Sequence, residues 1–482
     1  MQFIKDYEMV CGLEVHVELA TKTKIFCSCP TTFGAEPNTQ CCPVCTGMPG
    51  TLPVLNKQVV DYAVKAGIAT NCEIARYSKE DRKNYFYPDL PKAYQISQYD
   101  LPLCEHGWLE IETDNGTKKI GITRIHIEED AGKLMHDDTH GTMIDCNRCG
   151  VPLIEIVSEP DIRTAEEAVA YVRKLRAIML YTGVSDCRMN EGSLRCDVNL
   201  SVRKRGEEKF GTRTEMKNIN SFSAAERAIE YEVNRQIDVV SEGGTITQET
   251  RRWDDSRGKN MVMRSKEDAQ DYRYFPDPDL VAVEISDEWL EQIRSEIPEL
   301  PQSRYNRYME EIGLQPKEAR ILADSFDKAC LLDEGVNMQR VDAKNIANWI
   351  LSDISKYLND KNLELKDTKL TAQKLVDMIE LIEKNTISGN AGKKVLVQLF
   401  ETDDSVDTIV DKLGLKQVSD EGAIQKLVDE VLAANPKSVA DYKKGKKNAI
   451  GFLVGQCMKA SKGKGNPKMI NQLLSKTLDS ME

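Results

Sequence analysis

Acidic residues interrupt several segments of this chain that have the pattern of β-strands. In GLEVHVEL, Glu14 and His16 alternate with apolar residues, so they share one face of a strand. Further acids lie in the segments ITRIHIEED, VPLIEIV and LRCDVNLSV: Glu128, Glu129, Glu155 and Asp197. Carboxylates that converge with one imidazole suit Mg²⁺, which prefers oxygen ligands, and Mg²⁺ indicates phosphate chemistry. The alternative for each acid is a solvated surface charge, because spacing alone does not make the strands neighbours.

Two close pairs of cysteines indicate a second kind of metal site. In FCSCPTTFGAEPNTQCCPVC, Cys27 and Cys29 are separated by twelve residues from Cys42 and Cys45. Two such pairs joined by a short loop can surround one tetrahedral ion, and Zn²⁺ suits four thiolates. A complete set of four protein ligands makes such a site structural, since no position stays open for water. Cys41 adjoins Cys42 and could replace it, and unrelated buried cysteines are the alternative.

The common signatures of nucleotide-binding enzymes and hydrolases are missing from the sequence. The segment closest to a P-loop, GNAGKKV, lacks the required spacing, and neither the protein-kinase motifs nor a G-x-S-x-G elbow occurs. If this protein uses ATP, it binds the nucleotide without a P-loop.

Length and composition are those of a multidomain protein from a reducing compartment. A chain of 482 residues exceeds the usual size of one hydrophobic core, so two to three domains are expected. No apolar run is long enough to cross a bilayer, and the start, MQFIKDYEMV, lacks the apolar core of a signal peptide. We therefore expect a cytoplasmic protein without membrane contact. Its 14 cysteines then serve metal binding, catalysis or burial rather than disulfides.

Charge is unevenly distributed along the chain. The net charge is −13, but the segment from Lys437 to the end has ten lysines against three acidic residues, a local charge of +7. An acidic body argues against indiscriminate nucleic-acid binding, whereas a basic tail can neutralise backbone phosphates. The candidate phosphate-binding residues are Lys443, Lys444, Lys446, Lys447, Lys459, Lys462 and Lys464. A solvated lysine-rich loop is the alternative.

The periodicity of the sequence changes near residue 295. The first part is rich in strand patterns and contains two helices, 164–183 and 223–243, each opening with a capping-box pattern at Thr164 and Ser223. The rest has helical periodicity. We predict an α+β domain with a mixed or antiparallel sheet over 1–294, an all-helical domain over 295–407 and a small helical tail domain over 408–482.

Several long segments, taken together, resemble a known family. In order, GLEVHVEL, DRKNYFYPDLPKAYQISQYD, ITRIHIEEDAGK, VPLIEIVSEPD, EGSLRCDVNLS, TEMKNINSF, QETRRWD and DYRYFPDPDL are similar to the B subunits of the aspartyl/glutamyl-tRNA amidotransferases. The similarity extends to GKKNAIGFLVGQCMKASKGKGNP in the tail. The resemblance implies a cradle domain of the α+β class, a helical domain and a tail domain like the YqeY proteins.

The resemblance also implies an activity and partners. In this family a heterotrimer contains an amidase subunit (A), which releases ammonia from glutamine, and a small subunit (C). The family's B subunits use ATP to phosphorylate the side-chain carboxylate of Glu on tRNA(Gln) or Asp on tRNA(Asn). Channelled ammonia then displaces phosphate, so the enzyme is a carbon–nitrogen ligase acting on misacylated tRNA. Which of the two amides the cell makes stays open.

The family's phosphorylating site carries over to residues of this chain. Its members here are Glu14, His16, Glu128, Glu129, Glu155 and Asp197. Within this set we assign Mg²⁺ to His16, Glu129 and Glu155, and a second ion or ATP positioning to the other acids. The four cysteines correspond to a zinc site that some family members have, and the tail lysines would contact tRNA.

Three other functions compete with this interpretation. A non-catalytic RNA-binding module would explain the cysteines and the basic tail but not the acids within strands. A ligase like an aminoacyl-tRNA synthetase is the second, because MKASKGK faintly resembles the K-M-S-K-S signature, although no H-I-G-H motif precedes it. A purely structural scaffold is the third.

Overall fold

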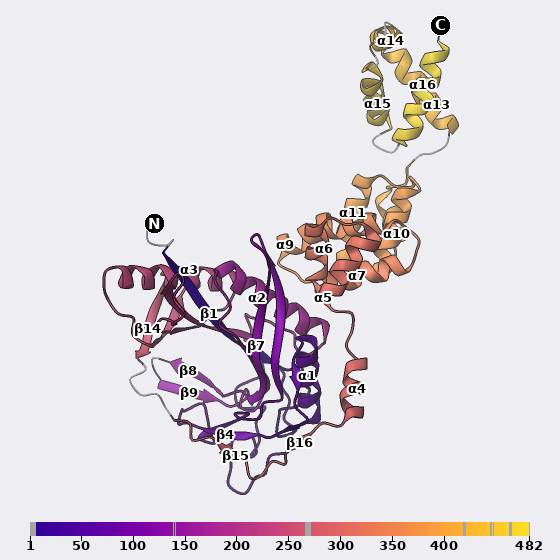
Figure 1. The fold of residues 1–482 in the computed structure, drawn as a ribbon. Helices are drawn as coiled ribbons and strands as arrows, with labels where there is room; N and C mark the ends of the chain where they lie inside the picture. Colours follow the sequence, from indigo (N-terminus) through magenta and orange to yellow (C-terminus); the bar gives the residue numbers. More distant parts are fainter. Residues whose placement is uncertain are drawn as a thin grey trace. The chain divides into compact units, whose positions relative to one another are not determined.

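The structure is a computed structural model that describes residues 6–137, 139, 141–265, 271–417, 421–443, 446, 448–461 and 465–481. The chain divides into two compact units, residues 1–303 and residues 304–482. The first unit combines strands and helices, and the described part of the second is helical (Figure 1). The predicted α+β class is confirmed.

The first unit is built on a sheet of nine strands. Their order across the sheet is β14-β13-β12-β11-β1-β10-β7-β6-β2. The bounds are β1 (Tyr7–Glu18), β2 (Glu73–Ile74), β6 (Cys104–Thr113), β7 (Gly116–Glu129), β10 (Pro152–Ser158), β11 (Leu194–Lys204), β12 (Thr214–Lys217), β13 (Glu249–Asp254) and β14 (Lys259–Ser265). The pair β12–β13 is parallel and the other neighbouring pairs are antiparallel, in agreement with the predicted mixed sheet.

Three smaller sheets belong to the same unit. One has the order β15-β4-β5, and the others are the pairs β16–β3 and β8–β9. Their bounds are β3 (Tyr77–Ser78), β4 (Asp81–Asn84), β5 (Tyr94–Ser97), β8 (Lys133–Asp137), β9 (Gly141–Asp145), β15 (Phe275–Pro276) and β16 (Val283–Glu284).

Helices cover one face of the large sheet. They are α1 (Lys57–Ala69), α2 (Ala165–Tyr181), α3 (Phe222–Ser241) and, beside α1, α4 (Asp287–Ser295). Leu13, Val15 and Val17 of β1 are buried in a core shared with α1, α2 and α3. Because side chains alternate along a strand, Glu14 and His16 must project from the opposite face. The alternation in GLEVHVEL thus separates a core face from a polar face.

The two predicted helices of this unit are present. Thr164 caps α2, where its Oγ1 accepts a hydrogen bond from the backbone N–H of Glu167 at 3.1 Å. The cap of α3 is Ser221 rather than the predicted Ser223, since the Ser221 Oγ accepts from the N–H of Ala224 at 3.1 Å. Both serines suit an N-cap, and the backbone of Ser221 is the extended one that a cap requires.

The second unit consists of helices in its described residues. From α5 (Pro301–Arg307), which crosses the boundary, they continue as α6 (Pro316–Ala323), α7 (Phe326–Asn337), α8 (Ala343–Trp349), α9 (Ser355–Lys361), α10 (Ala372–Glu383), α11 (Gly389–Glu401) and α12 (Val406–Leu413). The last four are α13 (Glu421–Ala434), α14 (Pro436–Lys443), α15 (Ala449–Ala460) and α16 (Pro467–Ser480). Ile424, Leu453 and Leu474 lie in a core that these last four helices share. None of the described helices combines the length and apolar character needed to span a membrane.

Candidate functional site

Strand register brings the predicted acids and histidines together on one face of the large sheet. Antiparallel pairing of β1 with β10 sets His16 opposite Glu155, and pairing of β10 with β7 sets Glu155 opposite His126. On the other side of β1, Glu14 lies opposite Asp197 of β11. Four neighbouring strands thus contribute to one polar surface, which no single strand pattern could show.

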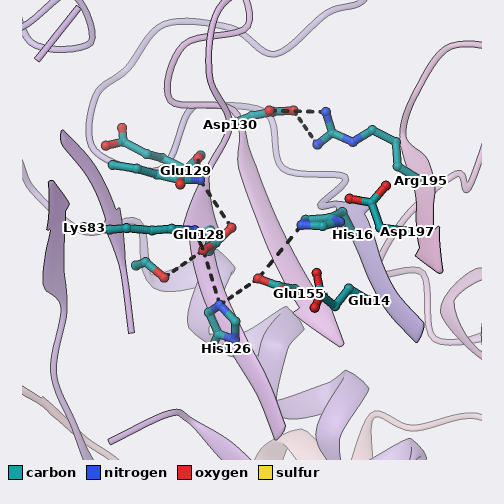
Figure 2. Close-up of polar contacts among 12 residues, drawn as sticks. Glu14, His16, Lys83, His126, Glu128, Glu129, Asp130, Glu155, Arg195 and Asp197 are labelled. Carbon is teal, nitrogen blue, oxygen red and sulfur yellow. Dashed lines mark hydrogen bonds and ion pairs between the residues drawn. The ribbon is translucent and has the colours of Figure 1, made fainter. Parts of the chain in front are cut away.

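Three of these residues form a candidate metal site. His16, Glu128 and Glu155 each offer a ligand atom, and the three atoms lie within 4.8 Å of one another. The Nε2 of His16 is 3.9 Å from Glu155 Oε2 (Figure 2). We call these residues the triad. One imidazole and two carboxylates are a donor set that fits Mg²⁺.

A buried histidine keeps the two triad carboxylates ionised. The Nε2 of His126 lies 3.1 Å from Glu155 Oε2 and 3.3 Å from Glu128 Oε1. Burial opposes a charge on His126, but the two carboxylates outweigh it and raise its pKa to about 9. In turn, despite burial, the charge of His126 lowers the pKa of Glu155 to about 2. Burial likewise opposes ionisation of Glu128, but Lys83 and His126 hold its pKa well below the usual value. Ionised carboxylates are the form that binds a cation.

The three-stranded sheet β15-β4-β5, which we call the small sheet, positions Glu128 of the triad. Ser97 of β5 donates to Glu128 Oε1 at 2.8 Å, and Gln95 of the same strand donates to Oε2 at 3.2 Å. Lys83 of β4 places its Nζ 3.6 Å from Oε1 (Figure 2). Glu128 is 3% exposed, so these contacts replace the water that a free carboxylate would hold.

Glu129 points elsewhere. Its Oε1 accepts hydrogen bonds from Lys92 Nζ and, at 2.9 Å, from the backbone N–H of Ile96. The expected magnesium set of His16, Glu129 and Glu155 is therefore not brought together, and Glu128 takes the third place. Alternation along β7 explains why Glu128 and not Glu129 joins the triad. His126 and Glu128 project from the polar face of the sheet, and Glu129 projects from the other face. Glu129 lines a separate cavity of about 120 Å³ between the small sheet and the cysteine loop.

A second acidic cluster lies beside the triad. Glu14, Asp197 and Glu215 offer oxygens within 4.8 Å of one another. Lys217 Nζ pairs with Asp197 and lies 3.1 Å from Glu215 Oε1. Burial and the neighbouring acids, Glu155 first among them, raise the pKa of Glu14. Glu215 is not among the residues predicted for the site, although its alternation with Met216 in TEMKNINSF was an available signal.

The predicted cysteine set forms a tetrad. The sulfurs of Cys27, Cys29, Cys42 and Cys45 lie within 4.8 Å of one another. The Sγ of Cys41 instead lies 3.3 Å from the carbonyl oxygen of Asn38, so the geometry favours Cys42 over its neighbour. Four converging thiols on one loop fit a structural zinc ion.

A buried lysine supports the tetrad electrostatically. Lys24 is completely buried, and its Nζ lies 3.5 Å from Cys45 Sγ. A hydrogen bond from the Cys27 thiol, together with the charge of Lys24, lowers the pKa of Cys45 to about 4. A thiolate is the form of cysteine that binds metal.

A pocket of about 300 Å³ adjoins the second acidic cluster. Its floor is β1 at Gly12, and its walls include Ser158, Asn199, Phe210 and Arg213. The Nδ2 of Asn199 donates to Glu14 Oε1 at 3.0 Å, so the pocket is continuous with the acids. Aromatic and apolar walls with a few polar groups are typical of small-molecule sites.

Three of the predicted tail lysines are described and exposed: Lys443, Lys446 and Lys459. The Nζ of Lys446 lies 3.2 Å from Asp441 Oδ1. The other four predicted residues, Lys444, Lys447, Lys462 and Lys464, lie outside the described residues.

Relatives of the chain are known over nearly its whole length. It matches the family described as the GatB/GatE catalytic domain over residues 9–291 and the family described as the GatB domain over residues 333–478. The B subunit of the aspartyl/glutamyl-tRNA(Asn/Gln) amidotransferase of Caldicellulosiruptor bescii is 56% identical over 480 residues, 99% of this chain and 100% of the relative. The protein of the same name from Bacillus velezensis is 56% identical over 469 residues, 97% of this chain and 98% of the relative. The chain therefore belongs to the family of aspartyl/glutamyl-tRNA(Asn/Gln) amidotransferase B subunits.

Proposed function

We propose that this chain activates the side-chain carboxylate of Glu-tRNA(Gln) or Asp-tRNA(Asn) within a glutamine-dependent tRNA amidotransferase, a carbon–nitrogen ligase. Family membership supports the reaction class. The observation that carries the proposal is the triad, in which His16 lies beside two buried carboxylates held in the ionised form. Burying charged groups in a sheet is costly, and buried carboxylates and histidines with strongly shifted pKa values gather at functional sites.

The chemistry requires an acyl phosphate. A carboxylate does not react with ammonia until one of its oxygens becomes a leaving group. When bound, ATP supplies the phosphoryl group, and Mg²⁺ spreads its charge and aligns the attacking and leaving oxygens. His16, Glu128 and Glu155 would hold the ion. Lys83 and His126 keep positive charge beside the carboxylates, which limits repulsion of the anionic substrates.

The pocket at Gly12 is the proposed location of the nucleoside part of ATP. Its volume of about 300 Å³ suits part of a ligand rather than a whole nucleotide. Phosphates extending from it would pass the cluster of Glu14, Asp197 and Glu215. This cluster would hold a second cation, while Lys217 and Arg213 offset the negative charge.

The remaining assignments follow from the family and from charge. The four cysteines would bind a structural Zn²⁺ that orders the loop beside Lys24. Partner subunits, an amidase (A) and a small subunit (C), would supply ammonia and complete a heterotrimer. The tail lysines would bind tRNA phosphates. We retain the cradle domain over 1–294, the helical domain over 295–407, the YqeY-like tail over 408–482 and a cytoplasmic location as parts of the proposal.

The decisive experiment compares two neighbouring acids. The chain is purified with its partners and supplied with Glu-tRNA(Gln), ATP, Mg²⁺ and ammonium chloride, which bypasses the amidase. We expect Glu128→Gln to reduce both ADP and Gln-tRNA formation on the order of a hundredfold or more, because it removes a charged member of the triad. Glu129→Gln should retain ADP formation that depends on charged tRNA, since Glu129 contacts Lys92 and Ile96 instead.

Two results would contradict the proposal. If Glu128→Gln formed ADP at the wild-type rate, the triad would have no part in the phosphorylation. A wild-type complex that binds charged tRNA without cleaving ATP would favour the non-catalytic RNA-binding module.

A further inference from the structure

Four tyrosine rings gather next to the triad, and we call them the tyrosine cluster: Tyr85, Tyr99, Tyr272 and Tyr274. The rings of Tyr99 and Tyr274 are stacked, with centroids 4.2 Å apart and planes 6° apart. Tyr272 meets Tyr274 edge to face at 6.0 Å and Tyr85 at 5.9 Å. The rings come from two segments that are distant in sequence, so the fold assembles the cluster.

The cluster is connected to the triad through Lys83. Its Nζ lies 5.2 Å from the ring centroid of Tyr272 and 3.6 Å from Glu128 Oε1. A second connection runs from the hydroxyl of Tyr85 to Gln95 Oε1 at 3.4 Å, and from Gln95 Nε2 to Glu128 at 3.2 Å. Tyr272 and Tyr85 are therefore the members of the cluster next to Glu128, and Tyr274 connects Tyr99 to them.

The backbone around the rings is fixed in place. The backbone N–H of Asn84 in β4 donates a hydrogen bond to the carbonyl oxygen of Tyr272 at 2.9 Å. The N–H of Tyr99 donates to Asp81 Oδ2 at 3.0 Å, and the carbonyl of Tyr99 accepts from Arg124 Nη1 at 3.2 Å. Such contacts hold the rings ready without reorganisation on binding.

Tyr99 is the member of the cluster that is open to a ligand. Tyr274 covers one face of its ring, yet the residue is 52% exposed. Exposed aromatic rings are the usual platforms on which unpaired bases of single-stranded RNA stack.

We propose that Tyr99 receives the terminal adenine of the charged tRNA, so that the tyrosine cluster presents the aminoacyl end to the triad. This inference rests on the proposed function. The glutamyl side chain has only two methylene groups between the amino-acid backbone and its carboxylate, so the ribose and base must lie near the triad during phosphorylation. The pocket at Gly12 is lined by residues of β1, β10 and β11, whereas Tyr85 and Tyr99 follow β4 and β5 and Lys83 of β4 contacts Glu128 of β7, so the two adenine-containing substrates would use different parts of the polar face.

The kinetic test uses Tyr99→Ala in the assembled complex, with ammonium chloride as the nitrogen source. We expect the KM for Glu-tRNA(Gln) to rise about tenfold, which is typical for the loss of one stacked base, while the KM for ATP stays unchanged. Tyr99→Phe keeps the ring and should behave as wild type. Tyr77→Ala is a matched control, because Tyr77 is also 52% exposed but lies on β3 outside the cluster.

A binding test has a readout independent of activity. Uncharged tRNA that carries 2-aminopurine as its terminal base should lose fluorescence when the wild-type complex binds it, and should keep fluorescence with Tyr99→Ala. Absence of quenching with the wild type, or an unchanged tRNA KM in Tyr99→Ala, would overturn the inference. A rise in the KM for ATP instead would indicate that the cluster binds ATP rather than the terminal adenine of tRNA. A wild-type complex without amidation would refute the proposed function itself, so the two failures are distinguishable.

Discussion

One position along β7 separates two carboxylates with different surroundings. Glu128 lies among His126, Lys83 and the triad, whereas Glu129 bonds to Lys92 and to the backbone of the small sheet. Because side chains alternate along a strand, these neighbours in sequence lie on opposite faces. Alternation alone could not say which face held the other acids, because that depends on which strands are paired.

The zinc content of two cysteine variants tests whether Cys42 or its neighbour Cys41 is the metal ligand. We expect Cys42→Ser to reduce zinc from about one ion per chain to well below that, because it removes one of four thiolates. Cys41→Ser should retain the metal, since the sulfur of Cys41 lies at the carbonyl of Asn38 outside the tetrad. Elemental analysis of the purified complex measures both variants. Zinc retained by Cys42→Ser but lost by Cys41→Ser would reverse the assignment.

At the scale of elements, β1 supplies both the core and the site. The period-two pattern of GLEVHVEL was sufficient to predict this strand and its two faces. The pairing of β1 with β10 and β11 was not predictable, because these partners lie more than 130 residues away along the chain. The choice between Ser221 and Ser223 as the cap of α3 likewise depended on the backbone.

Substitution of Gly12 tests whether the pocket on β1 binds ATP. A Cβ added there would lie 3.5 Å from the carbonyl oxygen of Ser158, an ordinary contact, so Gly12→Ala should fold. The methyl group would occupy the pocket floor and raise the KM for ATP about fivefold or more, with the tRNA KM unchanged. Gly389→Ala is the control, because an added Cβ there meets no neighbouring atom within 4 Å. An unchanged KM for ATP in Gly12→Ala would remove the nucleotide from this pocket.

The anchoring of α3 makes stability depend on pH. Glu232 is completely buried and accepts hydrogen bonds from Thr214 at 2.9 Å and from Arg235 Nε at 3.0 Å. Burial opposes its charge, but Arg235 and Gln236 outweigh this and lower its pKa below the ordinary 4.5. The stabilisation is therefore complete above pH 4.5 and is lost as the pH falls toward the folded-state pKa.

Glu232→Gln should show this effect in thermal unfolding of the assembled complex. We expect a loss of about 3 kcal/mol at pH 6 and a smaller decrease in Tm from pH 6 to pH 4 than in wild type. Glu230→Gln changes an exposed acid of the same helix and serves as the control. An equal acid sensitivity of wild type and Glu232→Gln would contradict the assigned contribution.

At the scale of the whole molecule, the periodicity of apolar residues predicted the α+β class and the change to helices. The strand order did not follow from the sequence, since hydrophobic alternation specifies faces and not neighbours. The charge asymmetry between body and tail was visible from residue counts alone.

The basic tail should make tRNA binding dependent on salt. Replacing the exposed Lys443, Lys446 and Lys459 by glutamine should weaken tRNA binding and reduce the slope of log K against log salt, by roughly 0.7–0.9 for each phosphate that is no longer neutralised. A control triple, Lys317, Lys361 and Lys394, removes equal charge from the helices before the tail. Filter binding at several salt concentrations measures the slopes. Equal slopes for wild type and the tail variant would assign tRNA binding to another surface.

The central position of β1 has a consequence for synthesis of the protein. This strand precedes the others in sequence, and its neighbours β10 and β11 end at Ser158 and Lys204. At roughly 5–20 residues per second, these partners emerge from the ribosome roughly 10–40 s after β1. During that interval a strand with one apolar face and two unpaired edges is open to pairing with other chains. The nascent chain is therefore exposed to such pairing until residue 204 has been translated, and the triad, which lies on β1, β7 and β10, can form only once residue 158 has been translated.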